Sequence, residues 1–262
     1  MLMDETSRPL ALVTGASAGL GKVFAQRLAA QGHDLLLVAR DGERLRALSD
    51  ELRHAHGATC EAWPADLAQD ADVDRLVARL RTEARLAVIV NNAGFGTMGT
   101  LARTDPVRQD AMVRLHALTP MRLTQAVLPG MIARKRGTII NVSSVASFTA
   151  AVGNVNYCAT KAYLRVFSQA LALEVNHTGV RVQALCPGFL YSEFHDRLGF
   201  DRGRIPAWLW MRAADVVDAS LAQAARGGAA VCVPGWQYKV IVWALKYLAW
   251  AIGPLQRRYR RD

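Results

Sequence analysis

Two kinds of segment alternate along this chain and limit the folds that it can adopt. Short runs rich in leucine and β-branched residues predict the strands Leu10–Val13, Asp34–Val38, Thr59–Pro64, Val88–Val90, Thr138–Val142, Val180–Leu185 and Ala229–Val233. Segments of helical period fill the gaps, at residues 19–31, 41–56, 69–84, 105–133, 156–176 and 214–226. Because the strands are apolar almost throughout, we expect a parallel sheet buried between two layers of helices. The expected fold is an α/β, doubly wound, Rossmann-like single domain over residues 8–235, with ligand-bearing loops at the carboxyl ends of its strands.

Composition and charge exclude several classes of protein. The 262 residues are 52% hydrophobic and 21% charged, which is typical of a globular chain and excludes a disordered or fibrous one. The net charge of +10 raises nucleic acid, a membrane surface or a small anion as partners. No zinc finger, RNA-binding signature or clustered basic helix occurs within the domain, so we expect no nucleic-acid partner and no metal site.

The cysteines and the first residues bear on the cellular compartment. Cys60, Cys158, Cys186 and Cys232 lie far apart without a C-x-x-C pair, and their neighbours are apolar or small, so we expect buried reduced thiols. The sequence begins with acidic residues where a secretory signal would be basic. Both features predict a cytoplasmic protein.

A glycine-rich turn follows the first predicted strand, with Gly15, Gly19 and Gly21 in the sequence Thr-Gly-Ala-Ser-Ala-Gly-Leu-Gly. Glycine lets backbone N–H groups approach a pyrophosphate, and the helix that starts there offers its dipole to the same anion. A plain tight turn would use glycine as well. The phosphate loop of kinases and ATPases does not fit, because Leu20 replaces its second glycine and Val23 replaces the hydroxyl that binds Mg²⁺.

The end of the second strand favours one nicotinamide cofactor over the other. An acidic residue there would bind the 2′-hydroxyl of NAD, but the chain has Ala39 followed by Arg40. The planar cation of Arg40 can pair with a 2′-phosphate, which favours NADP (NADPH) over NAD. The alternative is a solvated arginine, and the neighbouring Asp41 weakens the argument.

A phenol and an ammonium group share one helix face in the sequence Tyr157-Cys158-Ala159-Thr160-Lys161. Residues four positions apart lie one above the other on a helix, so Tyr157 and Lys161 can reach one substrate. The hydroxyl of Ser144 follows the strand Thr138–Val142, at the edge where carboxyl-end loops hold reacting groups. We interpret these three side chains as a reaction centre.

In this combination the sequence resembles the short-chain dehydrogenase/reductase family, in its branch of single-domain enzymes. The resemblance covers about residues 8–235 and rests on motifs in family order: Thr14 to Gly21, Asp66-Leu67, Asn91-Asn92-Ala93-Gly94, Asn141-Val142-Ser143-Ser144, Tyr157 to Lys161, and Pro187-Gly188 followed by Ser192. It implies that the cofactor is bound by Thr14, Gly15, Ser17, Gly19, Leu20, Gly21, Arg40, Asp66, Leu67, Asn92, Ala93, Gly94, Tyr157, Lys161, Pro187, Gly188 and Ser192.

The resemblance also implies hydride transfer between nicotinamide and a carbonyl or alcohol carbon. Tyr157 would donate the proton, and Lys161 with the oxidised nicotinamide would lower the pKa of a phenol that is ordinarily near 10. Ser144 would hold the carbonyl oxygen, and Asn91 would support the central stretch of the cofactor.

One position departs from the family pattern. Where the family has a catalytic asparagine that helps to hold a proton-relaying water, this chain has His116. An imidazole can itself donate and accept protons near neutral pH, so His116 is a candidate catalytic relay. A histidine that is merely packed is the alternative. A non-catalytic dinucleotide-binding regulatory protein, with turnover lost through His116, is the alternative function, against which the intact Ser144, Tyr157 and Lys161 argue.

The loop from Phe189 to Met211 and the tail 236–262 bear on the substrate and the partners. The loop from Phe189 to Met211 is rich in aromatic residues, which suits a hydrophobic carbonyl or alcohol substrate, although core or subunit contacts would use the same residues. We expect a homo-oligomer, a dimer or tetramer. Residues 236–262 form an apolar and basic tail, for which two alternatives stand. It lies peripherally on the inner face of a membrane, or it covers the substrate pocket or packs on a second subunit.

Overall fold

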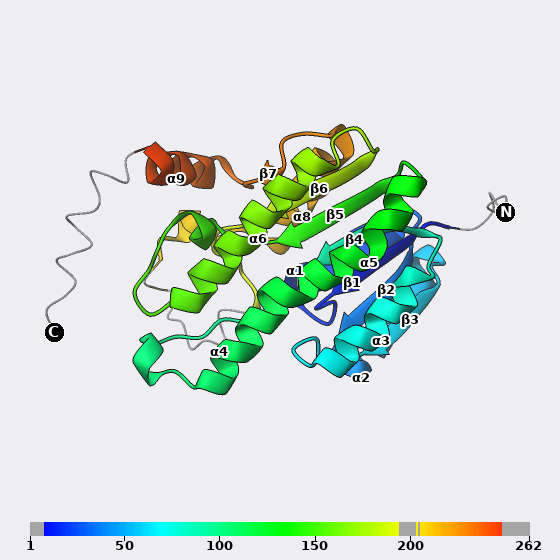
Figure 1. Ribbon diagram of the computed structural model, residues 1–262, viewed down its shortest axis with the longest axis horizontal. Coiled ribbons are helices and arrows are strands. Elements are labelled where there is room, and N and C mark those ends of the chain that lie inside the picture. Colours follow the sequence, from blue (N-terminus) through cyan, green and yellow to red (C-terminus); the bar gives the residue numbers. More distant parts are fainter. Residues whose placement is uncertain (1–7, 194–202, 204, 248–262) are drawn as a thin grey trace, which may run out of the picture.

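The computed structural model describes residues 8–193, 203 and 205–247 of the chain. Parallel strands form one sheet in the order β3-β2-β1-β4-β5-β6-β7 (Figure 1). The strands are β1 (Leu10–Thr14), β2 (Asp34–Ala39), β3 (Cys60–Pro64), β4 (Leu86–Asn91), β5 (Gly137–Val142), β6 (Val180–Leu185) and β7 (Val231–Cys232). From β1 the chain first winds outward to β3 and then returns to β4 on the other side of β1. The predicted doubly wound sheet is confirmed, and its switch point lies between β1 and β4.

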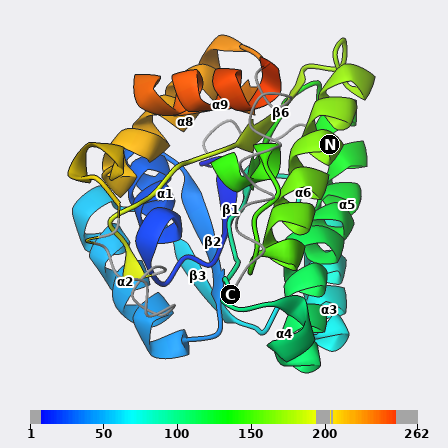
Figure 2. The same ribbon diagram turned by 90° about the vertical axis from the view of Figure 1, so that its left-hand side faces the viewer.

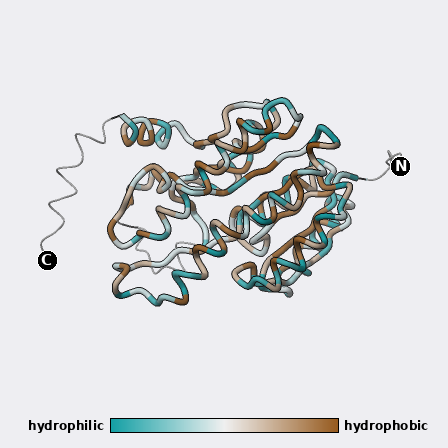
Figure 3. Tube along the Cα trace, in the orientation of Figure 1, coloured by the Kyte–Doolittle hydropathy of each residue, from teal (hydrophilic) through white to brown (hydrophobic). Residues whose placement is uncertain are grey.

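Helices cover both faces of this sheet. The helices α1 (Gly19–Ala30), α2 (Gly42–His56) and α8 (Ala213–Arg226) pack on one face, and α3 (Asp70–Arg81), α5 (Thr119–Ala133) and α6 (Val155–Glu174) on the other (Figure 2). Alternate residues of a strand enter the two cores, as Leu35 and Leu36 do. Hydrophobic residues accordingly follow the strands along much of their length (Figure 3). The expected three layers are present.

Two of the loops at the carboxyl edge end in an aspartate that caps the next helix. The carboxylate of Asp41 accepts a hydrogen bond from the Arg44 N–H (3.0 Å) and so caps α2. Asp105 caps α4 (Pro106–Val113) in the same way, through the Val107 N–H (3.0 Å). Pro106, at the first turn of α4, needs no N–H partner there. These two caps fix where the loops before α2 and α4 stop.

The segment 105–133, predicted as one helix, is interrupted. It consists of α4, a π-helical turn η2 (Arg114–Leu118) and α5, and the Thr119 N–H donates to the Arg114 carbonyl five residues back. Proline explains the wider turn. Pro120 has no N–H to give to the carbonyl of residue 116, and its ring would crowd that carbonyl in a regular α-helix. The interruption places His116 inside the π turn.

The tail begins with a helix, α9 (Trp236–Tyr247), which packs on the domain. Tyr238 and Val242 are buried, and Tyr238 belongs to the same hydrophobic cluster as β1 and α1. Residues 248–262, which complete the tail discussed above, lie outside the described residues. Among the described helices, none has the length and apolar character needed to cross a bilayer. The four cysteines are buried and free.

Candidate active site

The three residues interpreted as a reaction centre meet at the carboxyl edge of the sheet. Ser144 follows β5 and begins the short 3-10 helix η3 (Val145–Phe148), while Tyr157 and Lys161 lie in the first two turns of α6. A side-chain hydrogen bond joins Ser144 to Tyr157. The Ala146 N–H donates to the Ser144 Oγ (3.1 Å) and so fixes the orientation of the serine. The structure therefore brings the three together, as the sequence predicts.

Burial dominates the proton affinities of this centre. It raises the pKa of Tyr157 to about 12, against the opposing effect of the Ser144 hydrogen bond. It lowers the pKa of Lys161 to about 8, because a buried ammonium group loses its hydration. The Lys161 Nζ donates to the Val142 carbonyl (2.8 Å) and lies 5.8 Å from the centre of the Tyr157 ring. In the chain without cofactor the phenol therefore keeps its proton well above neutral pH, and burial outweighs the effect expected from Lys161.

The glycine-rich turn forms a cradle that fits a pyrophosphate. Gly15 and Gly19 have positive φ angles of 65° and 55°, which suit glycine. A Cβ at Gly21 would lie 2.1 Å from the Gly15 carbonyl oxygen, so only glycine allows this approach of α1 to the turn. The start of α1 has no side-chain cap and no acidic residue in its first turn. Its free N–H groups and positive dipole are thus available to an anion.

A polar network ties this turn to the loop after β4. The Thr14 Oγ1 accepts hydrogen bonds from the backbone N–H groups of Asn92 (2.9 Å) and Ala93 (3.0 Å). The Asn92 amide donates in return to the carbonyls of Thr14 (2.9 Å) and Gly15 (3.2 Å). The amide of Asn91 lies within the sheet and donates to Asn141 Oδ1 (2.8 Å) on β5. Asn91 therefore supports the strands, and Thr14 and Asn92 hold the two cofactor loops together.

The remaining sequence-predicted cofactor residues lie around the same edge. Arg40 is exposed at the end of β2 and makes no hydrogen bond or ion pair within the described part of the chain. Asp66 follows β3, where its carboxylate accepts from the Ala68 N–H (3.1 Å), and the neighbouring Leu67 is buried. Ser17 lies within the glycine-rich turn, and Leu20 is buried in the first turn of α1. The structure thus gives Arg40 an unengaged guanidinium on the side of the site where the ribose is expected.

Tyr238 on α9, which was not predicted as a site residue, packs against the Pro187-Gly188 turn. Tyr238 on α9 lies so close that a Cβ at Gly188 would be 1.8 Å from its Cζ atom. Its hydroxyl accepts from the Phe189 N–H (2.9 Å) and donates to the Leu209 carbonyl. Ser192 follows the turn and faces Gly19, whose added Cβ would be 3.8 Å from the Ser192 Cβ. One side of α9 therefore covers this turn.

An ion pair crosses the cofactor edge and was also not predicted. The Arg44 Nη1 lies 3.1 Å from Glu193, which follows Ser192, so it joins the start of α2 to the loop after β6. Both side chains are half exposed, which limits the strength of the pair. A contact between residues so far apart in the chain leaves no local signal in the sequence.

His116 is buried, and both of its ring nitrogens have partners. The Phe95 N–H donates to Nε2 (3.0 Å), and Nδ1 lies 3.1 Å from the Thr160 Oγ1 on α6. Burial and the nearby Lys161 hold the pKa of His116 well below its usual value. A Cβ at Gly94 would lie 2.8 Å from Nε2, which explains the glycine there. Of the two alternatives, this geometry favours a packed histidine over a proton relay.

The aromatic loop divides between core and surface. The ring of Trp210 is buried and packs 5.6 Å from Phe189 and 5.2 Å from Tyr191. Met211 pairs with the loop after β6 through its N–H, which donates to the Phe189 carbonyl (2.9 Å). Trp208 is exposed. Residues 194–202 of the loop, Phe194 among them, lie outside the described residues.

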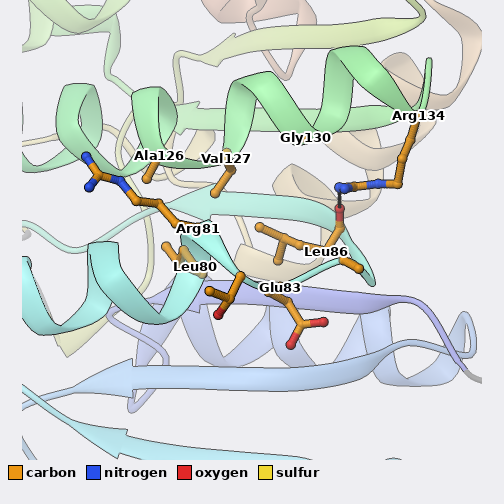
Figure 4. Close-up of a pocket in the computed structure, with 10 residues that line it drawn as sticks. Leu80, Arg81, Glu83, Leu86, Ala126, Val127, Gly130 and Arg134 are labelled. Atoms are coloured by element: carbon orange, nitrogen blue, oxygen red, sulfur yellow. Dashed lines mark hydrogen bonds between the residues drawn. The ribbon is translucent and has the colours of Figure 1, made fainter. Parts of the chain in front are cut away.

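A cavity of about 190 Å³ lies near the amino end of β4, away from the carboxyl ends of the strands (Figure 4). It is bounded by the end of α3, the start of β4 and the last turns of α5, and Arg134 closes one side by donating to the Leu86 carbonyl (3.1 Å). Leu86 begins β4, whereas the catalytic side chains follow the carboxyl ends of the strands. This cavity is therefore separate from the candidate active site.

Comparison with known proteins agrees with this arrangement. The model of the short chain dehydrogenase family matches residues 9–202. An uncharacterized oxidoreductase of Myxococcus xanthus is 36% identical over 239 residues, which are 91% of this chain and 92% of the relative. A short-chain dehydrogenase from Sphingobium yanoikuyae, solved in complex with NADPH, matches with a TM-score of 0.83 and 35% identity over 97% of this chain and 96% of its own.

A second solved structure extends the comparison to an enzyme with a stated substrate class. The bulky-bulky ketone specific alcohol dehydrogenase from Comamonas testosteroni matches with a TM-score of 0.80 and 32% identity. The match covers 93% of this chain and 94% of that enzyme. The family model spans most of the chain, and the glycine cradle and the Ser144, Tyr157 and Lys161 centre all lie within the matched residues. The chain therefore belongs to the short chain dehydrogenase family and is an NAD(P)-dependent dehydrogenase or reductase.

Proposed function

We propose that this chain is an NADP(H)-dependent enzyme that interconverts a hydrophobic carbonyl compound and its alcohol. One observation carries the proposal. Ser144, Tyr157 and Lys161 converge beside a glycine cradle, and the buried Tyr157, with a pKa of about 12, holds a proton that it can donate. This is the protonation state that carbonyl reduction needs at neutral pH.

The reduction needs a proton at the oxygen while the carbon receives a hydride. The reduced nicotinamide, when bound, supplies that hydride to the carbonyl carbon. The Ser144 hydroxyl holds the substrate oxygen by a hydrogen bond, and the Tyr157 Oη transfers its proton to the same oxygen as negative charge develops. The hydrogen bond between Ser144 and Tyr157 keeps both hydroxyls on one side of the site.

Lys161 stabilises the phenolate that this transfer leaves behind. Its ammonium group lies one helical turn from Tyr157 and is held by the Val142 carbonyl, so it is oriented before substrate arrives. With a pKa of about 8, it carries its charge at neutral pH. In the direction of alcohol oxidation the same charge favours the phenolate, which then accepts the proton of the alcohol.

The preference for NADP over NAD rests on Arg40. Its guanidinium is exposed beside the site and unengaged within the described residues, and Ala39 before it offers no carboxylate to a ribose diol. A guanidinium pairs with a phosphate through two parallel hydrogen bonds. The NADPH held by the Sphingobium yanoikuyae enzyme supports the same preference.

A hydrophobic substrate is supported by the aromatic side chains of the loop after β6. Phe189 and Tyr191 follow the Pro187-Gly188 turn and both pack on Trp210, and Tyr191 remains half exposed. The ketone specificity stated for the Comamonas testosteroni enzyme points in the same direction. Such rings favour a substrate with apolar groups on its carbonyl carbon.

Two surfaces support further expectations. Exposed apolar side chains on α5 and α6, including Val166 and Leu173, suit a second copy of the chain, and a homo-oligomer would be detected by light scattering.

The outward side of α9 carries Trp236, Val240 and Trp243, and a basic sequence follows the helix, which suits an anionic membrane surface. Sedimentation with anionic liposomes tests this contact: pelleting that is lost at high salt supports it, and a protein that stays in the supernatant at low salt refutes it.

The proposed reaction is tested with a panel of ketones, aldehydes and alcohols. Oxidation of NADPH or NADH is followed by its absorbance with each carbonyl compound, and reduction of NADP or NAD with each alcohol. We expect turnover with NADPH and the carbonyl compounds that carry bulky apolar groups. Turnover confined to NADH, or confined to small polar substrates, would contradict the cofactor or the substrate part of the proposal respectively.

A further inference from the structure

Three hydrogen bonds in series connect the loop after β4 to the helix that carries Tyr157. The Phe95 N–H donates to the His116 Nε2 (3.0 Å), the His116 Nδ1 contacts the Thr160 Oγ1 (3.1 Å), and this oxygen contacts the Asn156 carbonyl (2.7 Å). The series begins and ends on backbone atoms. His116 is its central member, and it comes from a third element, the π turn η2.

The direction of the series fixes the tautomer of His116. A backbone N–H can only donate, so Nε2 must accept and carries no proton. The Asn156 carbonyl can only accept, so the Thr160 hydroxyl donates to it and receives a hydrogen bond from His116. The proton of the neutral imidazole therefore lies on Nδ1. A second proton at Nε2 would remove the acceptor of the Phe95 N–H.

The surroundings of His116 match this neutral form. Lys161 on α6 is the charged group that affects it, and the Tyr157 ring lies 5.9 Å away on the same helix. From the loop after β4 it faces the Phe95 ring, also at 5.9 Å, over which the guanidinium of Arg108 on α4 is placed. Both neighbouring charges are positive, and the contacts of His116 with this loop are a backbone N–H and an aromatic edge. Nothing in this set favours an imidazolium.

We infer that His116 is a positioning residue, a neutral spacer that sets the loop after β4 at a fixed distance from the catalytic helix. On the loop side, Asn92 and Ala93 contact the cofactor cradle at Thr14 and Gly15, and the helix side carries Tyr157 and Lys161 on either side of Thr160. The inference rests on the proposed function of those two residues. It also means that protons of Lys161 leave the site without passing through His116.

Nuclear magnetic resonance of the full-length protein with ¹⁵N-labelled histidine tests the tautomer directly. The His116 signals, identified by their loss in His116→Gln, should show the proton on Nδ1 and no conversion to the doubly protonated imidazolium between about pH 5.5 and pH 8.5. Conversion to the imidazolium in this range, or a proton found on Nε2 of the neutral ring, overturns the inference. The same spectrum of Tyr157→Phe should show the same tautomer, so this measurement does not depend on turnover.

Kinetics with two substitutions separate the contact of His116 with Phe95 from its contact with Thr160. His116→Asn keeps an amide near Thr160 and loses the acceptor of the Phe95 N–H, so we expect KM for NADPH to rise about tenfold with a smaller change in kcat. Thr160→Val instead removes the hydroxyl that joins α6 to His116, and should lower kcat with little change in KM. His177→Asn, at an exposed histidine beyond the end of α6, is the matched control and should change neither.

The pH dependence distinguishes a spacer from a relay. For a spacer, the kcat profiles of His116→Asn and His116→Gln keep the ionisations of the unmodified enzyme. If either variant loses an ionisation near neutrality, His116 transfers protons and the inference is wrong. If Tyr157→Phe retains full turnover, the proposed function fails, while the tautomer measurement still decides the state of His116.

Discussion

The hydroxyl of Tyr238 holds two segments of the active-site loop together, and its removal tests how α9 shapes the cofactor site. Tyr238→Phe removes one oxygen and leaves the ring that lies against Gly188. The Phe189 N–H loses its acceptor at 2.9 Å, and the Leu209 carbonyl loses its donor. A net contribution of about 1 kcal/mol for each hydrogen bond, together with the cost of two poorly solvated partners, gives a loss of roughly 2–3 kcal/mol in the free energy of unfolding.

The loss should be visible by thermal and chemical denaturation. For a chain of 262 residues we expect the midpoint of thermal unfolding to fall by roughly 4–12 °C, since each kcal/mol corresponds to about 2–4 °C at this size. Tyr247→Phe on the same helix is the matched control: its side chain is 63% exposed, and the change should alter the free energy by less than about 0.5 kcal/mol.

The same variant should also bind NADPH more weakly. The Pro187-Gly188 turn keeps its packing against the ring but loses the tether on Phe189, so we expect the Kd measured by fluorescence titration to rise several-fold. Unchanged stability and unchanged affinity in Tyr238→Phe would refute the view that α9 holds this turn in place. An equal loss in Tyr247→Phe would show that the helix acts through another contact.

Two further predictions concern charge in the cofactor site. Arg40→Ala should weaken binding of NADPH by about 1.5–3 kcal/mol and leave NADH nearly unchanged, since only NADPH has the 2′-phosphate; equal effects on the two cofactors in a titration would contradict the assignment. The value of kcat/KM for NADPH should fall as the pH rises through about 8, because the pKa of Lys161 in the free enzyme is about 8 and its charged form is present only below that value. Tyr157, with a pKa of about 12, keeps its proton throughout this range, so a flat profile from about pH 6 to pH 10 would be evidence against a charged Lys161.

Local patterns were sufficient to predict the order of strands and helices. Strands and helices differ in the period of their apolar residues, and both periods are visible within a few residues of sequence. The segment 105–133 shows the limit of such patterns. Its apolar residues follow a helical period throughout, while the π turn depends on Pro120 and the carbonyl of residue 116, a backbone effect that the period does not record.

The candidate site was predictable where one short motif carries the chemistry. The glycine-rich turn and the Tyr157 to Lys161 pair are each contained in a few residues, and both lie where they were expected. Contacts between distant parts of the chain were not predictable. Thr160 meets His116 across 44 positions, and Tyr238 meets Phe189 across 49, with nothing in either neighbourhood to mark the partner. Tyr238 is buried, whereas Trp236 and Trp243 on the same helix are exposed.

Turnover by Tyr157→Phe is the most direct test of the account. The substitution removes one oxygen from a buried ring, so NADPH should still bind with nearly unchanged Kd. General acid catalysis is worth about 10²–10⁴-fold, and we expect kcat for the best carbonyl substrate to fall by at least that factor at neutral pH. If Tyr157→Phe binds NADPH normally and keeps a substantial kcat, the proton comes from another group, and the assignment of the reaction centre is wrong.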